Sequence, residues 1–450
     1  MPILPIDTGR YGSDEIKRIF EEQSRLDYEL EFEASVAQAQ GEIGLIPPKA
    51  AKEIALKARS GNISIKRVKE LEAVSEHDTA AIVESINELC DNDVKPWIHY
   101  GLTSYDVVDT VISMQIRDSL QVLKPKIIKF TTLLVEKAVK YKDTPAVGRT
   151  HGQHASIIAF GLKFAVWASD MANHIERLKE MERRVLVCKT LGVVGTGSLM
   201  GIKALDVQKL VAKKLKLYPI CAATQIVSRE RHSELIFTVA LIASTLDKIA
   251  VEIRNLQRTE INEVMEPFMK GQMGSSAVPV KKNPIKSERT SSLARLIKSM
   301  VSVSLENISL WHERDLSNSA NERFTIPITV ILLDEMLNSM VKVIMGLNVD
   351  ENRISQNLEL TRGQIYSEFV LDALIKKGMP RLQAYRTIQT IAFDATKKEI
   401  HFFVALRNDK EISSILNNDE LKIIFNPNNH LAASYKIINN VVKFVRKTYK

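Results

Sequence analysis

Residues 271–284 form a polar stretch with the residue types of a mobile catalytic loop. Ser275 and Ser276 supply hydroxyl groups beside flexible backbone, and Lys281 and Lys282 supply cations that can hold carboxylates. A connection of this length is unusual in a compact helical protein, and such loops are often functional. The composition therefore favours an active-site lid, with a plain helix–helix connection as the alternative.

Two histidines in the segment 149–154 are the next candidates for chemistry. His151 and His154 have the i, i+3 spacing of residues on one helix face, which a metal pair uses. No Cys, Asp or Glu lies close enough in the sequence to complete such a site, so we expect no metal. Imidazole titrates near neutral pH, which makes His151, beside Gly152, the better general acid or base. His154 is expected to be a structural, hydrogen-bonded residue.

Two further segments combine polar side chains in a helical context. Glu76, His77 and Asp78 place an imidazole between two carboxylates. Thr103 and Ser104 put hydroxyl groups at an expected helix start, where free backbone N–H groups favour an anion. Plain N-capping is the alternative interpretation of these two hydroxyls.

A third polar segment runs from residue 314 to residue 323. The spacing of Arg314, Ser319 and Arg323 predicts two cations and a hydroxyl near one face of a helix. Such a face suits a phosphate, because charged donors bind phosphate oxygens strongly. A solvated charged face is the alternative.

Long helices are expected to position these segments. The chain has only 18 Gly and 14 Pro in 450 residues, and residues 220–266 and 285–326 contain neither. Apolar residues recur every three or four positions from Leu235 to Leu256, which indicates a continuous buried stripe. We therefore predict an all-α chain whose long helices pack side by side in a bundle. A helix of about 40 residues would be about 60 Å long, and we expect a homo-oligomer to cover it.

The pattern predicts three parts along the chain. Residues 1–110 read as a small helical domain, residues 111–350 as the central long-helix bundle with the polar loop, and residues 351–450 as a second small helical domain.

Composition and charge narrow the class of protein. With 45% hydrophobic and 26% charged residues the chain is globular rather than disordered. Three widely spaced cysteines (Cys90, Cys188 and Cys221) without a CxxC pair suit a reducing cytoplasm. We find no signal-peptide pattern and no apolar run that would span a membrane. The net charge of +8 suits either nucleic acid or a pocket for small anions, and we favour the pocket.

Together these segments resemble the signature blocks of the fumarase/aspartase superfamily of lyases. The blocks occur in order as Gly101-Leu-Thr-Ser104, Thr150-His-Gly-Gln153 and Gly274-Ser-Ser-x-x-Pro-x-Lys-x-Asn-Pro284 followed by Glu288. Within the superfamily the chain is most similar to the adenylosuccinate lyases. The segments that carry this resemblance are Arg10-Tyr11, His77-Asp78, residues 99–109, Thr224-Gln225-Ile226 and residues 311–323.

The resemblance implies a function and an assembly. These lyases release fumarate from adenylosuccinate, giving AMP, and from the succinylated ribotide SAICAR, giving AICAR. The family implies small-molecule substrates, no metal or organic cofactor, and a cytoplasmic homotetramer whose active sites draw residues from three subunits. It gives no role to nucleic acid or a membrane.

The resemblance also implies a role for each candidate residue. Ser275 would be the general base and His151 the general acid, oriented by Glu288, while Lys281 and Asn283 would bind the carboxylates of the fumarate portion. The phosphate and ribose side would be held by Arg10, Tyr11, Arg314, Ser319 and Arg323. The succinyl pocket would be lined by Thr103, Ser104 and Gln225. His77 would bind substrate near the phosphate or the leaving group, and the remaining binding candidates are Glu76, Asp78 and His99.

Four positions depart from the residues usual in the family. They are Glu76 in place of Arg, Val278 in place of Met, Val280 in place of His or Tyr, and Asn318 in place of His. None removes a residue that elimination needs.

Three alternative functions predict different features of the sequence. A sister enzyme such as argininosuccinate lyase would lack the Arg10-Tyr11 pair and the phosphate set. A non-catalytic homologue would more readily have lost Ser275 or His151. A nucleic-acid-binding helical protein is suggested only by the net charge.

Overall fold

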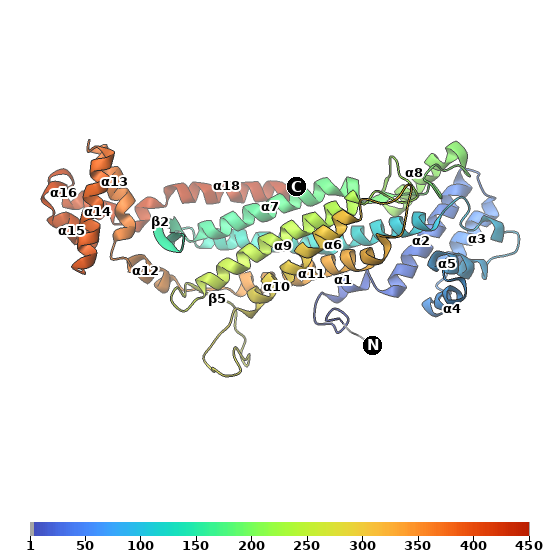
Figure 1. The fold of residues 1–450 in the computed structure, drawn as a ribbon, viewed down its shortest axis with the longest axis horizontal. Helices are drawn as coiled ribbons and strands as arrows, with labels where there is room; N and C mark the ends of the chain where they lie inside the picture. Colours follow the sequence, from blue (N-terminus) through green and yellow to red (C-terminus); the bar gives the residue numbers. More distant parts are fainter. Residues whose placement is uncertain (1–3, 450) are drawn as a thin grey trace. The chain divides into compact units, whose positions relative to one another are not determined.

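The computed structural model describes residues 4–449, and most of this part of the chain is helical (Figure 1). It contains helices α1 to α18 and three two-stranded sheets, so the predicted all-α fold class is confirmed. In the same residues no helix is both long enough and apolar enough to cross a bilayer.

By its internal contacts the chain divides into two compact units, each assembled from three stretches of sequence. The first unit takes residues up to 127, 174–244 and 292–338, and the second takes residues 128–173, 245–291 and 339–450. Five long helices contribute residues to both units: α6 (Ser104–Lys140), α7 (Gly161–Val185), α9 (Glu230–Leu256), α10 (Ile285–Glu306) and α11 (Ser319–Gly346). The three-part division predicted along the sequence stays a prediction.

The apolar stripe predicted from Leu235 to Leu256 lies on α9, and its members are at most 3% exposed. The helix is nevertheless shorter than the stretch without Gly or Pro, since it begins only at Glu230. Burial of the stripe, rather than the lack of breakers, therefore sets the extent of this helix.

The prediction of one helix face for Arg314, Ser319 and Arg323 is wrong. Residues 285–326 contain no Gly or Pro, yet they do not form one helix. Helix α10 ends at Glu306, and α11 begins only at Ser319. In the intervening segment the Asp315 carboxylate accepts hydrogen bonds from the backbone N–H groups of Trp311 (2.7 Å) and Ser317 (2.8 Å). Such side-chain acceptors compete with helical hydrogen bonds and favour a turn.

The first unit also contains a cluster of shorter helices near the N-terminus. Residues such as Leu26, Ile54 and Ile82 form its apolar core. The shorter helices of this unit are α1 (Asp14–Arg18), α2 (Glu22–Glu42), α3 (Pro48–Ala58), α4 (Ile65–Ser75), α5 (Asp78–Asn87) and α8 (Ala204–Leu215).

The second unit contains a separate cluster near the C-terminus, with Val370, Leu374 and Phe402 fully buried in its core. The shorter helices of this unit are α12 (Glu351–Glu359), α13 (Ser367–Lys376), α14 (Arg381–Lys397), α15 (Phe402–Asn408), α16 (Lys410–Ile415), α17 (Asn418–Ile424) and α18 (Ala432–Thr448).

The strands are short and form three two-stranded sheets. Strand β1 (Pro145–Thr150) pairs antiparallel with β2 (Gln153–Ala159) in a hairpin. The other pairs are parallel β3 (Val187–Cys188) with β4 (Tyr218–Pro219), and antiparallel β5 (Val264–Met265) with β6 (Asn348–Val349).

Gly161, the first residue of α7, allows a close approach to the end of α6. A Cβ atom at this position would lie 2.2 Å from the carbonyl oxygen of Ala138 and 2.9 Å from the backbone nitrogen of Lys142. We predict that Gly161→Ala lowers the free energy of unfolding by about 2–3 kcal/mol, because the overlap forces backbone apart. Urea unfolding measures this, with the exposed Glu176→Ala on the same helix as control. An unchanged urea midpoint for Gly161→Ala would contradict the observed packing.

Candidate active site

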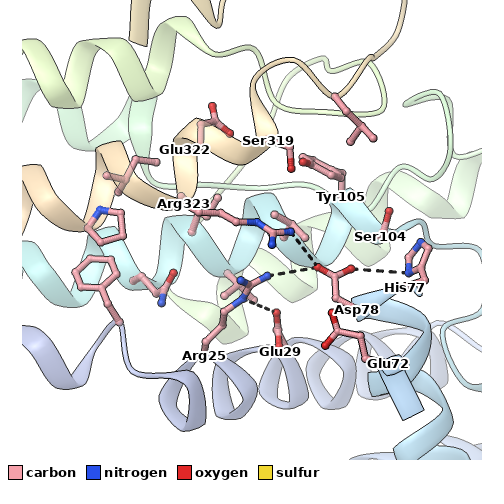
Figure 2. Close-up of a pocket in the computed structure, with 18 of the residues that line it drawn as sticks. Arg25, Glu29, Glu72, His77, Asp78, Ser104, Tyr105, Ser319, Glu322 and Arg323 are labelled. Atoms are coloured by element: carbon pink, nitrogen blue, oxygen red, sulfur yellow. Dashed lines mark hydrogen bonds and ion pairs between the residues drawn. The ribbon is translucent and has the colours of Figure 1, made fainter. Parts of the chain in front are cut away.

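A cavity of about 380 Å³ lies in the first unit (Figure 2). Its walls come from α2, the corner between α4 and α5, the first turns of α6, and the segment 314–327. Seven residues predicted for the site line it: Glu76, His77, Asp78, Ser104, Arg314, Ser319 and Arg323. The fold therefore brings together three segments that lie far apart in the sequence.

The corner between α4 and α5 presents the predicted carboxylate–imidazole group. Glu76 ends α4 in the left-handed conformation, with φ of 50°, and His77 is the N-cap of α5. The Nδ1 atom of His77 accepts the backbone N–H of Ala80 at 3.2 Å. A neutral His77 ring therefore carries its proton on Nε2 and can donate it to a ligand.

Asp78 lies between two guanidinium groups in the cavity, as Figure 2 shows. Its Oδ2 atom is 3.7 Å from Arg25 Nη2 and 3.7 Å from Arg323 Nη2. Arg25 also donates a hydrogen bond to Glu29 at 3.0 Å. Burial raises the pKa of Glu29, and the negative charges of Asp78 and Glu72 raise it further, while Arg25 lowers it. Of these two cations, Arg25 is paired closely with Glu29, whereas Arg323 is held only by the longer contact with Asp78.

Arg314 is fixed by two neighbours on the cavity wall. Its Nη1 donates to Gln225 Oε1 at 2.6 Å, and its Cζ lies 3.8 Å from the centre of the Tyr105 ring. Among the residues that the structure describes, none accepts a hydrogen bond from its buried Nε. Gln225 itself does not line the cavity but acts on it through Arg314.

A buried charge network lies behind this wall. Arg229, only 1% exposed, donates to both carboxylate oxygens of Asp109 at 2.8 and 3.0 Å, and its Nε lies 3.1 Å from Glu322. The Glu322 carboxylate also lies 3.3 Å from His232 Nδ1 and accepts a hydrogen bond from the Asn318 side-chain amide at 2.9 Å. Burial alone would raise the pKa of Glu322, but His232, Arg229 and Asn318 together lower it. Glu322 is therefore ionised at neutral pH and fixes the first turn of α11.

The turn before α6 is held by a second buried pair. Asp106 and Lys189 are both fully buried and lie 2.5 Å apart. The Asp106 carboxylate also accepts the backbone N–H groups of Thr103 (2.9 Å), Leu191 (3.1 Å) and Gly192 (3.0 Å). The helix start predicted at Ser104 is confirmed, but the cap on Thr103 comes from Asp106 rather than from a hydroxyl.

His151 lies in the second unit, at the tip of the β1–β2 hairpin. His151 and Gly152 have φ of 52° and 74°, as in the two-residue turns that suit a hairpin. The i, i+3 spacing of His151 and His154 is therefore not that of a shared helix face. His154 lies on β2, and its buried Nδ1 has no hydrogen-bond partner among the described residues, so the predicted hydrogen bond is also absent there. Burial, together with Arg149, lowers the pKa of His154.

The polar loop lies between β5 and α10 and is the long excursion below them in Figure 1. Its base is fixed, because the Glu266 carboxylate accepts the N–H of Ser287 at 2.8 Å and Gln257 donates to the carbonyl of Lys282 at 2.9 Å. Asn283 donates to the carbonyl of Gly274 at 2.9 Å. A Cβ on Gly274 would lie 2.0 Å from the carbonyl oxygen of Lys281, so only glycine fits there.

Ser275 is held inside this loop by its neighbours. Its Oγ accepts the backbone N–H groups of Ala277 (3.3 Å) and Val278 (3.1 Å). His151, Lys281 and Glu288 are exposed. Within the described part of the chain, no hydrogen bond joins any two of these four side chains.

The remaining predicted residues lie in the first unit but do not line the cavity: Arg10, Tyr11, His99, Thr103 and Gln225. His99 is the most constrained of them. Its Nδ1 lies 2.7 Å from Oε1 of the buried Glu33. Arg10 and Tyr11 precede α1, where Arg10 is exposed and Tyr11 is half-buried.

Sequence reasoning missed several residues that line the cavity: Arg25, Glu29, Glu72, Tyr105 and Glu322. Arg25 and Glu29 carry a weak sequence signal, since opposite charges four residues apart on a helix form a pair. Tyr105 and Glu322 lie directly beside predicted residues, but nothing in their spacing indicates which way they face.

We predict that Asp106→Asn lowers the free energy of unfolding by about 3–5 kcal/mol, because it leaves the buried Lys189 ammonium without a counter-charge. The matched control is Asp206→Asn, which breaks an exposed Asp–Lys pair with side chains 62% and 68% exposed. That change should stay below about 1 kcal/mol. Urea unfolding compares the two, and equal losses would contradict the role given to the buried pair.

We predict a pH-dependent contribution to stability from His99. Burial alone would lower its pKa, but the charge and hydrogen bond of Glu33 outweigh burial and raise it above the ordinary value of about 6.5. The stabilisation is therefore complete below about pH 6.5 and is lost as pH rises through the raised pKa. His99→Gln should narrow the difference in unfolding free energy between pH 6 and pH 9. An equal difference in wild type and variant would refute this assignment.

The family models and the curated relatives that match this chain all describe lyases. The family model described as Lyase matches residues 9–298, and the model described as Adenylosuccinate lyase C-terminus matches residues 363–441. The chain is 42% identical to the adenylosuccinate lyase of Pyrococcus abyssi, with 99% of each chain covered. It is 39% identical to that of Methanocaldococcus jannaschii, with 99% of this chain and 96% of the relative covered.

Solved structures agree on the fold. The 3-carboxy-cis,cis-muconate lactonizing enzyme of Pseudomonas putida superposes with a TM-score of 0.90 at 26% identity, covering 99% of this chain and all of that one. A fumarate lyase from Mesorhizobium gives 0.89 at 28% identity, covering 98% and 100%. From the family matches and the full-length identities we conclude that the chain belongs to the adenylosuccinate lyase family.

Proposed function

We propose that this lyase releases fumarate from adenylosuccinate, giving AMP, and from SAICAR, giving AICAR. The observation that carries the proposal is the full-length identity to archaeal adenylosuccinate lyases, combined with a cavity that gathers Arg314, Ser319 and Arg323. Both substrates share a ribose phosphate and a succinyl group, so one site can serve both.

The cavity supplies what a phosphate monoester needs. Arg314 and Arg323 are cations, and the unpartnered Nε of Arg314 is a donor without an acceptor among the described residues. Ser319 is the first residue of α11, where backbone N–H groups are free and the helix dipole favours an anion. At 3.7 Å from Arg323, Asp78 holds that cation too loosely to prevent exchange for a phosphate.

In the proposed reaction Ser275 removes a proton from the succinyl Cβ. The electron pair left on that carbon delocalises onto the adjacent carboxylate, and then forms the C=C bond of fumarate as the C–N bond breaks. His151 donates a proton to the departing nitrogen, so charge and protons balance. Lys281 and Asn283 bind the carboxylates on which negative charge develops.

A serine can act as the base only if its alkoxide form is stabilised, because a hydroxyl is too weak an acid to ionise near pH 7. The backbone N–H groups of Ala277 and Val278 already point at Ser275 Oγ, at 3.3 and 3.1 Å. Two such donors stabilise an alkoxide, and the Lys281 cation adds to them once the loop closes over substrate. The contacts inside the loop support the choice of Ser275.

We propose a homotetramer in which subunits share active sites. The exposed positions of His151 and Glu288, with no hydrogen bond between the two side chains among the described residues, support this. Large apolar side chains stay exposed on the bundle helices and favour association: Phe237 and Val251 on α9, Leu296 and Leu305 on α10, and Phe324 and Met345 on α11.

A cytoplasmic location is part of the proposal. Cys90, Cys188 and Cys221 are free, and burial raises the pKa of Cys90 to about 11 and of Cys188 to about 12. Unpaired thiols of this kind suit a reducing compartment. The proposal assigns no metal, no organic cofactor, and no nucleic acid or membrane partner.

The sister activity most worth separating is that of argininosuccinate lyase. The match of residues 363–441 to the adenylosuccinate lyase C-terminus favours the purine substrate. Purified protein is mixed separately with adenylosuccinate and argininosuccinate, and fumarate is followed enzymatically. We expect fumarate from adenylosuccinate alone; fumarate only from argininosuccinate would reverse the choice of substrate.

We predict that Ser275→Ala and His151→Ala each lower kcat by at least about 10³-fold, the upper range for loss of an acid or base. Ser302→Ala, an exposed serine on α10, is the control and should keep wild-type kcat. Size-exclusion chromatography with light scattering checks that each variant keeps the wild-type mass. Near-normal turnover in either variant would show that the base or the acid is another residue.

A further inference from the structure

Tyr105 is a cavity residue outside the signature blocks, and its aromatic ring faces Arg314 of the cavity wall and Arg229 of the buried network behind it. The Cζ atom of Arg314 lies 3.8 Å from the ring centre, and that of Arg229 lies 5.6 Å from it. The residue is only 6% exposed. A guanidinium so close to an aromatic face is attracted to it, and more strongly where water is excluded.

Arg314 needs such a partner because the backbone does not fix it. It lies in the non-helical segment between α10 and α11, where no regular ladder of hydrogen bonds sets its direction. Its hydrogen bond to Gln225 fixes one nitrogen, Nη1, and leaves the plane of the guanidinium free to turn. Stacking on Tyr105 removes that freedom, so that Nε and Nη2 keep one orientation.

The ring itself is held rigidly. Tyr105 is the second residue of α6, directly before Asp106, whose buried carboxylate binds Lys189 and three backbone N–H groups. On the same ring, Arg229 is anchored by Asp109 and Glu322. A ring between fixed partners is a suitable support for a side chain on a loop.

We propose that Tyr105 is a positioning residue, whose ring orients the Arg314 guanidinium toward the phosphate of the substrate. The identity of that substrate rests on the proposed function. The hydroxyl of Tyr105 makes no hydrogen bond to any described residue, so the ring, and not the hydroxyl, does the positioning.

Steady-state kinetics of Tyr105→Leu and Tyr105→Phe with adenylosuccinate test this. Leucine removes the aromatic face and should raise KM about tenfold with kcat within about threefold of wild type. Phenylalanine keeps the face and should restore KM to within about twofold of wild type. A wild-type KM in Tyr105→Leu would overturn the proposal, and so would an equal loss in both variants, which would transfer the role to the hydroxyl.

A second measurement needs no substrate and separates this proposal from the proposed function. Urea unfolding of wild type, Tyr105→Leu, Arg314→Met and the double variant forms a double-mutant cycle on the full-length protein. Stacking predicts that the double variant loses less stability than the two single losses combined. Additive losses would overturn the positioning role. If wild type released no fumarate from adenylosuccinate, the proposed function would fail and this cycle alone would decide on Tyr105.

Discussion

Two buried carboxylates at the start of α6 hold the rest of the cavity in place. Asp106 and Asp109 lie three residues apart, are at most 1% exposed, and each faces a buried cation, Lys189 and Arg229. Burying such ions costs several kcal/mol each unless hydrogen bonds replace the lost water. Here they do, since Asp106 accepts from three backbone N–H groups and Asp109 from the backbone of Val227. Because the bonded groups come from distant segments, the pairs join these segments in one geometry.

The loop that carries Ser275 is constrained in the opposite way. Its ends are tied through Glu266 and Gln257, whereas Lys281 and most of the residues between Gly271 and Lys282 are exposed. Segments with few buried contacts open at low free-energy cost. In the proposed reaction the fixed cavity would bind the phosphate, which does not react, and the loosely held loop would bring the proposed base Ser275 over the reacting carbon.

The sequence was sufficient to predict the helical class, the buried stripe of α9 and seven of the residues that line the cavity. These depend on periodicity and on short motifs, which are local. It was insufficient for the break before Ser319, where Asp315 side-chain bonds outweigh helix propensity. It also did not indicate the hairpin that carries His151, whose two-residue turn has positive φ. The role of Arg25 and Tyr105 depends on contacts between distant segments, which no single segment encodes. The three-part domain division and the catalytic roles remain predictions.

Subunit complementation tests most directly whether the active site is assembled from several chains. Inactive Ser275→Ala and His151→Ala proteins are mixed, dissociated, allowed to reassociate, and assayed for fumarate release from adenylosuccinate. If Ser275 and His151 of one site come from different subunits, random reassembly restores up to about one quarter of the sites. Recovery of activity toward that level, absent when either variant is treated alone, is the result that the account predicts. A mixed oligomer that forms but stays inactive would contradict it, because both residues would then have to come from one chain.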